Sequence, residues 1–169
     1  MLSALPLAAG LGAALGALLL ALQAVLTLLL PEAVRRSYEA ASTPSPWEDF
    51  LASISAGDNG EVLFRLGLVT LFVFLGARLL RQGDRPTTGV VWTAMVLATL
   101  LFGAVHLPHA AALGGGLPAS LKAFVLLGNG LGGLVFGWLY WKRGLLAAVT
   151  AHFAVDLVLH AIAPNISSI

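Results

Sequence analysis

The chain has 169 residues, of which 59% are hydrophobic and only 10% charged, and its formal net charge at pH 7 is +1. Soluble domains carry about 25% charged residues, so the composition indicates an integral membrane protein in contact with lipid, and the near-neutral charge argues against a nucleic-acid partner. The sequence contains no cysteine. This excludes a disulfide framework, a thiolate zinc site and a cysteine nucleophile.

The first apolar segment covers about residues 5–30, and no charged residue occurs before Glu32. A signal peptide would need a basic start and an apolar stretch of about 7–15 residues. We therefore interpret this segment as a retained transmembrane helix. The connection that follows, residues 31–60, is polar, and its Trp47 and Phe50 suit a helix at the membrane interface.

A spanning helix needs about 20 mostly apolar residues. Four further segments approach that length, at residues 61–80, 89–107, 121–141 and 145–162. Turns rich in glycine, proline and charge separate them. The sequence predicts an all-α, polytopic transmembrane helix bundle with about five spans.

The predicted organisation has three parts. Residues 1–48 hold the first span and the polar linker, residues 49–163 form the core, and residues 164–169 are a tail. We expect the third span to end before Pro108, because proline disrupts a helix.

Charged and imidazole side chains interrupt three of the predicted spans. Glu61 and Arg65 open the second span, and His152 and Asp156 lie inside the fifth; each pair is four residues apart, so its members share a helix face. His106 lies at the expected end of the third span. Burying a charge in the bilayer is costly, by about 2.5–3.5 kcal/mol on insertion scales, so these residues are candidates for one functional site.

Each candidate also has a structural interpretation. Glu61 is either a carboxylate beside a reacting water or half of an ion pair with Arg65. Asp156 either orients the ring of His152 or helps it to stabilise an oxyanion, or the two residues form a purely structural pair. His106 alone would also suit an interfacial helix end.

Other polar and small residues favour structural roles. We interpret His109 and His160 as interfacial residues and Asn129 as a hydrogen-bonding contact between helices. Two pairs of glycines in the fourth span have the spacing that lets helices approach closely. They are Gly128 with Gly132, and Gly133 with Gly137.

A carboxylate and an imidazole can activate water for attack on a carbonyl, while a second imidazole stabilises the oxyanion. No serine lies in a G-x-S-x-G setting. A divalent metal such as zinc, held by the histidines with Asp156 or Glu61, is chemically allowed. Because the H-E-x-x-H signature is missing, we predict no metal or other cofactor.

Three motifs carry a resemblance to a known family: Gly60-Glu61-Val62-Leu63-Phe64-Arg65, Phe102-Gly103-Ala104-Val105-His106 and His152-Phe153-Ala154-Val155-Asp156. In that order, on the second, third and fifth predicted spans, they are similar to the E-E-x-x-x-R, F-x-x-x-H and H-x-x-x-N/D motifs of the CPBP family of intramembrane proteases. This family includes CAAX-processing type II endopeptidases and bacteriocin-processing proteins. The resemblance covers about residues 50–163.

The resemblance implies an intramembrane endopeptidase with a protein or peptide substrate. Glu61 with His106 would activate water, His152 and Asp156 would stabilise the oxyanion, and Arg65 would anchor Glu61. Phe102 would support the site as the first residue of its motif. The short chain favours a bacterial plasma membrane.

One position departs from the family pattern. Gly60 stands where the family has the first glutamate, generally taken as the catalytic base. Successive helical residues point about 100° apart, so Glu61 would have to be re-aimed, which the freedom of Gly60 would help, or Asp58 would have to substitute. The alternatives are a catalytically impaired member that acts as a membrane binding or chaperone-like protein, and an intramembrane proton or ion pathway.

Overall fold

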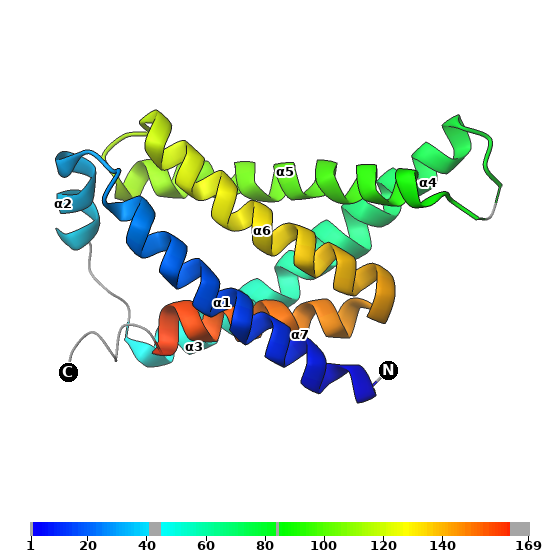
Figure 1. Ribbon diagram of the computed structural model, residues 1–169, viewed down its shortest axis with the longest axis horizontal. Helices are drawn as coiled ribbons and strands as arrows, with labels where there is room; N and C mark the ends of the chain where they lie inside the picture. The colour runs from blue at the N-terminus through cyan, green and yellow to red at the C-terminus, as the bar shows by residue number, and fades with distance from the viewer. Residues whose placement is uncertain (1, 41–44, 84, 163–169) are drawn as a thin grey trace.

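The computed structural model describes residues 2–40, 45–83 and 85–162, and this part of the chain contains helices and turns but no strand. Figure 1 shows a bundle of crossing helices. The α-helices in chain order are α1 (Leu5–Thr27), α2 (Glu32–Ala40), α3 (Pro46–Glu61), α4 (Thr70–Leu79), α5 (Thr88–Leu113), α6 (Ala119–Arg143) and α7 (Leu145–Asp156). A short 3₁₀ turn, η1 (Leu2–Ala4), precedes α1, and two π-helical segments, η2 (Val62–Val69) and η3 (Leu157–Ile162), follow α3 and α7.

The all-α, polytopic prediction is confirmed. Four helices are long and apolar enough to cross a membrane: Leu5–Thr27, Asp58–Leu79, Thr88–Leu113 and Ala119–Arg143. The fifth predicted span is also helical, but its apolar stretch, Leu145–His160, is shorter than the other four. The protein is therefore a membrane-embedded bundle of four long helices and one short apolar helix.

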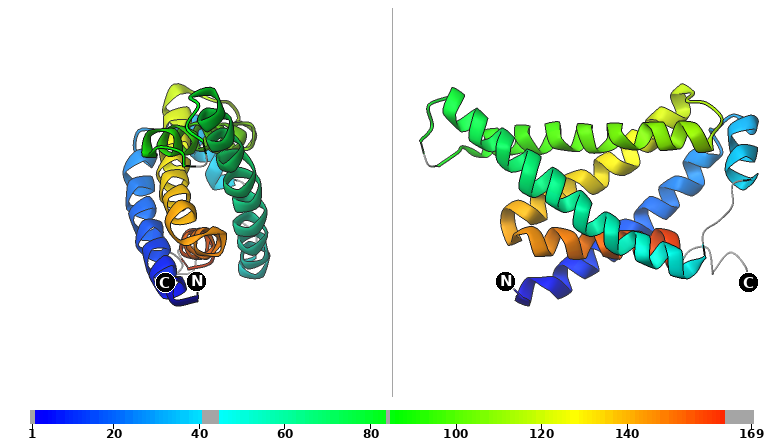
Figure 2. Two further views of the ribbon diagram at one scale, coloured as in Figure 1. Left: turned by 90° about the vertical axis from the view of Figure 1, so that its right-hand side faces the viewer. Right: turned by 180° about the vertical axis from the view of Figure 1, so that it is seen from behind.

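The second span begins earlier than the sequence predicts. Helix α3 starts at Pro46 and continues through η2 into α4, so the interfacial helix expected around Trp47 and Phe50 joins the second span in one long rod (Figure 2, right). Ser45 starts it with a capping box: its hydroxyl accepts from the Glu48 backbone N–H (3.3 Å), and the Glu48 carboxylate accepts from the Ser45 N–H (2.8 Å). The remaining linker also contains α2.

The third span ends later than predicted. Helix α5 runs through Pro108 to Leu113. Proline removes one backbone donor, and surrounding helices can accommodate such an interruption inside a membrane bundle. The prediction that Pro108 ends the span is wrong, and His106 lies within the helix rather than at its end.

Glycines bring two pairs of helices into close contact. A Cβ atom at Gly12 of α1 would lie 2.3 Å from the carbonyl oxygen of Ala151 in α7. On α6, a Cβ atom at Gly133 would lie 2.7 Å from Thr99 of α5, and one at Gly137 would lie 3.2 Å from Met95. The predicted close packing is confirmed for this second glycine pair.

The first pair of glycines on α6 has another environment. A Cβ atom at Gly128 would meet nothing within 4 Å, and one at Gly132 would meet only Phe136 of the same helix. Both glycines line a cavity. Interhelical packing is thus the wrong interpretation for Gly128 and Gly132.

Candidate active site

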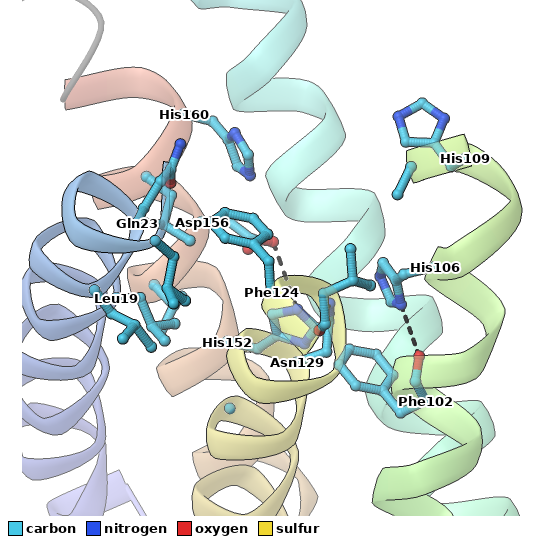
Figure 3. Close-up of a pocket in the computed structure, with 18 of the residues that line it drawn as sticks. Leu19, Gln23, Phe102, His106, His109, Phe124, Asn129, His152, Asp156 and His160 are labelled. Atoms are coloured by element: carbon cyan, nitrogen blue, oxygen red, sulfur yellow. Dashed lines mark hydrogen bonds and ion pairs between the residues drawn. The ribbon is translucent and has the colours of Figure 1, made fainter. Parts of the chain in front are cut away.

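A cavity of about 500 Å³ lies among α1, α5, α6 and the α7–η3 segment. Its walls are mostly apolar, with a small number of polar groups that project from different helices (Figure 3). These polar residues are Gln23, His106, His109, Asn129, His152, Asp156 and His160. A largely apolar cavity with convergent polar groups is the usual form of a binding site.

Behind one wall of this cavity lies a buried polar network. The side chains of Glu61 and Arg65 are 0% and 2% exposed, and the Arg65 Nε atom lies 3.1 Å from the Glu61 Oε2 atom. Arg65 also donates from Nη2 to the carbonyl oxygen of Gly133 (3.0 Å). These contacts join the start of the second span to α6 and satisfy the requirement that buried charges be paired.

The network ends on His152, whose Nδ1 atom lies 2.9 Å from the Glu61 Oε1 atom. At this distance, the imidazole Nδ1–H donates a hydrogen bond to the carboxylate. The ring stacks on Phe136, with centroids 4.6 Å apart and planes 17° apart, and meets the edge of Phe102 at 5.8 Å. His152 is therefore held at Nδ1 by Glu61 and packed against two aromatic rings.

The second nitrogen of His152 is turned toward Asp156, one helical turn further along. Its Nε2 atom lies 3.6 Å from the Asp156 Oδ2 atom, close enough for an ion pair but longer than a hydrogen bond. Both residues line the cavity. The His152 ring thus separates an enclosed side, at Nδ1, from an open side, at Nε2.

His106 lies on α5, in a different wall of the same cavity. Its Nδ1 atom is 2.7 Å from the carbonyl oxygen of Phe102, one turn earlier in the helix (Figure 3). Because a carbonyl can only accept, Nδ1 carries the proton, and Nε2 of the neutral ring is an acceptor. Phe102 contacts both histidines, since its ring also meets the edge of His106 at 4.8 Å.

Not all residues predicted for the site face the cavity. In the described part of the chain, His106, His152, Asp156 and Phe102 line it, whereas Glu61 and Arg65 do not. Glu61 bonds His152 rather than the expected His106. The Glu61–Arg65 ion pair predicted as the structural alternative is present.

The two remaining candidates lie on α3. Asp58 is exposed and does not line the cavity. The Cα atom of Gly60 faces the site. A Cβ atom built there would lie 3.5 Å from Cε1 of His152 and 3.9 Å from the ring of Phe102. Both distances are ordinary van der Waals contacts. A side chain at position 60 would therefore fit beside His152, although glycine supplies no carboxylate.

Three further residues outside the predicted site also line the cavity. His109 and His160, interpreted as interfacial, line the cavity. Asn129, interpreted as a contact between helices, donates to the Val125 carbonyl of its own helix (2.9 Å) and also lines the cavity. Gln23 was not singled out from the sequence, although a lone amide in an apolar helix is a signal that could have identified it.

The histidines and carboxylates do not form a ligand set. Among the described residues, no three His, Asp or Glu side chains lie close enough together to hold a metal ion.

Comparison with known proteins identifies one family. The profile of the type II CAAX prenyl endopeptidase Rce1-like family matches residues 43–158, which is more than half of the chain and includes all three motifs. No curated protein and no solved structure matches the chain. The chain belongs to the Rce1-like family of type II CAAX prenyl endopeptidases, a family of membrane-embedded proteases.

Proposed function

We propose that the protein is an intramembrane endopeptidase, located in a bacterial plasma membrane, that hydrolyses a peptide bond near the membrane surface. One observation carries this proposal. His106 and His152 come from different helices to one cavity, and each ring has one nitrogen bound by the protein and the other nitrogen available. In such a pair, one histidine can transfer protons while the other stabilises the negative charge that forms on the substrate.

His106 is the proposed general base. Its Nε2 atom takes a proton from a water molecule as the water oxygen attacks the carbonyl carbon of the substrate. The Nδ1–H, which donates to the Phe102 carbonyl, fixes the tautomer and orientation of the ring. The resulting imidazolium then protonates the leaving amine as the C–N bond breaks, which returns His106 to its neutral form.

His152 is the proposed oxyanion donor. In the doubly protonated ring, the Nε2–H would hydrogen-bond to the tetrahedral oxyanion while the Nδ1–H stays bonded to the carboxylate of Glu61. Asp156 lies beside this nitrogen and holds the ring edge before substrate binds. A preformed donor of this kind requires no rearrangement during the reaction.

Glu61 has a positioning role in this proposal. It is enclosed, paired with Arg65 and bonded to His152, so it acts on the substrate only through the His152 ring. Neither Gly60 nor the exposed Asp58 places a carboxylate in the cavity. Water activation therefore falls to His106.

Gly60 supports a second candidate function, which is binding without cleavage. In the family pattern the first glutamate of the motif occupies this position. A chain that lacks it would retain the cavity and the oxyanion donor and bind a membrane peptide as a chaperone-like protein. The two candidates differ in whether His106 suffices as the base.

The test is a cleavage assay with a panel of membrane-proximal peptides, analysed by mass spectrometry. The variants are wild type, Gly60→Glu, Glu61→Gln and Asp58→Asn. The proposal predicts cleavage by wild type and by Asp58→Asn, and reduced cleavage by Glu61→Gln because His152 loses its charged partner. Absence of cleavage by wild type together with cleavage by Gly60→Glu would favour the binding function instead.

A further inference from the structure

Helix α1 lies outside the part of the chain that matches the family, yet it is built into the site. It crosses α7 next to His152: Gly12 faces the carbonyl of Ala151, and Gly16 faces Val158, where a Cβ atom would lie 2.8 Å from the valine Cβ. Ala8 and Leu15 join the buried cluster that also contains residues of α6 and α7. These contacts fix the position of α1 against the helix that carries His152.

Beyond this crossing, α1 forms one wall of the cavity. Its lining residues are Leu19, Leu22, Gln23 and Leu26, which recur at the spacing of one helix face. In Figure 3, Gln23 lies on the same side of the cavity as Asp156 and His160, away from His106. The wall is thus apolar except for one amide.

Gln23 has no structural partner that accounts for it. Within Leu5–Thr27, only Gln23 and Thr27 have polar side chains, and the Thr27 hydroxyl is satisfied by the Gln23 backbone carbonyl (2.7 Å). Among the described residues, the side-chain amide of Gln23 makes no hydrogen bond within the protein. A polar group in a membrane helix that lines a cavity is expected to serve a ligand.

We propose that Gln23 is a specificity-determining residue that hydrogen-bonds the backbone of the substrate peptide; this inference rests on the proposed function. A peptide backbone offers a donor and an acceptor at each residue, and the amide of glutamine offers the complementary pair. The three neighbouring leucines would receive apolar side chains of the substrate. Helix α1 therefore selects an extended peptide with apolar side chains next to the bond that is cleaved.

The kinetic test compares Gln23→Met with Val25→Met. Methionine has nearly the shape of glutamine but lacks the amide, and Val25 is 60% exposed and does not line the cavity. We expect KM to rise about five-fold in Gln23→Met with kcat unchanged, the effect of one lost hydrogen bond. Val25→Met should match wild type, and equal KM values in all three proteins would overturn the proposal.

A second test does not depend on cleavage. Because the chain contains no cysteine, Gln23→Cys and Val25→Cys are single-cysteine proteins. Each is incubated in detergent with a synthetic apolar peptide whose single cysteine is activated as a thiopyridyl disulfide. The protein thiolate then displaces pyridine-2-thiol, and formation of the protein–peptide disulfide is measured. The proposal predicts a cross-link at position 23 and little or none at position 25; equal cross-linking at the two positions would overturn it.

The two tests separate this proposal from the proposed function. Cleavage by wild type with unchanged KM in Gln23→Met, and no preference for position 23, would remove Gln23 from the site and leave the protease function intact. Absence of cleavage together with selective cross-linking at position 23 would remove the protease function and retain Gln23 as a peptide-binding residue.

Discussion

The two ring nitrogens of His152 have different surroundings, because the protein encloses Nδ1 whereas Nε2 borders the cavity. On the enclosed side, Nδ1 bonds Glu61, which is paired with the buried Arg65. On the open side, Nε2 faces Asp156 across 3.6 Å and borders the cavity that also contains His106. Charges that are paired within the protein hold the structure together, whereas polar groups that lack a close partner are available to a substrate.

The largest expected effect is on the open side. His106→Ala removes the proposed base, so kcat/KM should fall by about 10²–10⁴-fold while the protein stays folded. The measurement combines peptide cleavage with thermal unfolding in detergent. The matched control is Val105→Ala, which changes an exposed neighbour outside the cavity. Loss of folded protein in His106→Ala would instead assign His106 a structural role.

The largest effect on stability is expected on the enclosed side. Arg65→Ala leaves the buried Glu61 carboxylate without its cationic partner, which should cost about 3–5 kcal/mol in the free energy of unfolding. The same substitution in a Glu61→Gln background should cost less, because no uncompensated charge remains. Equal costs in the two backgrounds of this double-mutant cycle would show that the pair is not coupled.

For the residues on the enclosed side, the sequence predicted which residues matter but not all of their contacts. The motifs and the four-residue spacing were sufficient to select Glu61, Arg65, His152 and Asp156, because paired charges in apolar helices are rare. The hydrogen bond between Glu61 and His152 could not be predicted. It depends on the rotation of the long α3–α4 rod about its axis, and this rotation is set by packing against α5 and α7.

Prediction of the fold from the sequence also succeeded for some helices and failed for others. Hydropathy predicted the apolar helices well, since their length follows from the thickness of the membrane. It did not predict that the interfacial helix starts at Pro46 and continues into the second span, although the capping-box sequence at Ser45 and Glu48 was present, because hydropathy does not detect a polar helix. The sequence interpretation also took Pro108 as the end of the third span, whereas α5 continues through it to Leu113.

A smaller effect is expected where α1 meets α7. In Gly12→Ala, the added Cβ would lie 2.3 Å from a backbone oxygen, so the helices must separate. We expect a loss of about 1–3 kcal/mol in the free energy of unfolding, typical of overpacking. Gly10→Ala is the matched control, because a Cβ there meets nothing within 4 Å. Thermal unfolding of the two variants compares them directly, and equal stability would contradict the close contact.

The smallest effect concerns the exposed start of α3, far from the site. The backbone N–H of Ser45, and next its hydroxyl, lower the pKa of the Glu48 carboxyl. A lowered pKa means that the ionised carboxylate stabilises the folded helix end at neutral pH, and that this contribution disappears as the pH falls through the lowered value. The protection factors of first-turn amides against hydrogen exchange should therefore fall at acidic pH in wild type but not in Glu48→Gln. The same pH dependence in both proteins would remove the capping box from the account.

The most direct test of the central claim, that His106 activates water without a carboxylate at position 60, is peptide cleavage by purified wild type in H₂¹⁸O. The account predicts cleaved peptide whose new carboxyl terminus carries ¹⁸O, with the same product formed by Val105→Ala and lost in His106→Ala. Intact peptide with wild type, under conditions in which Gly60→Glu produces the labelled fragment, would contradict it.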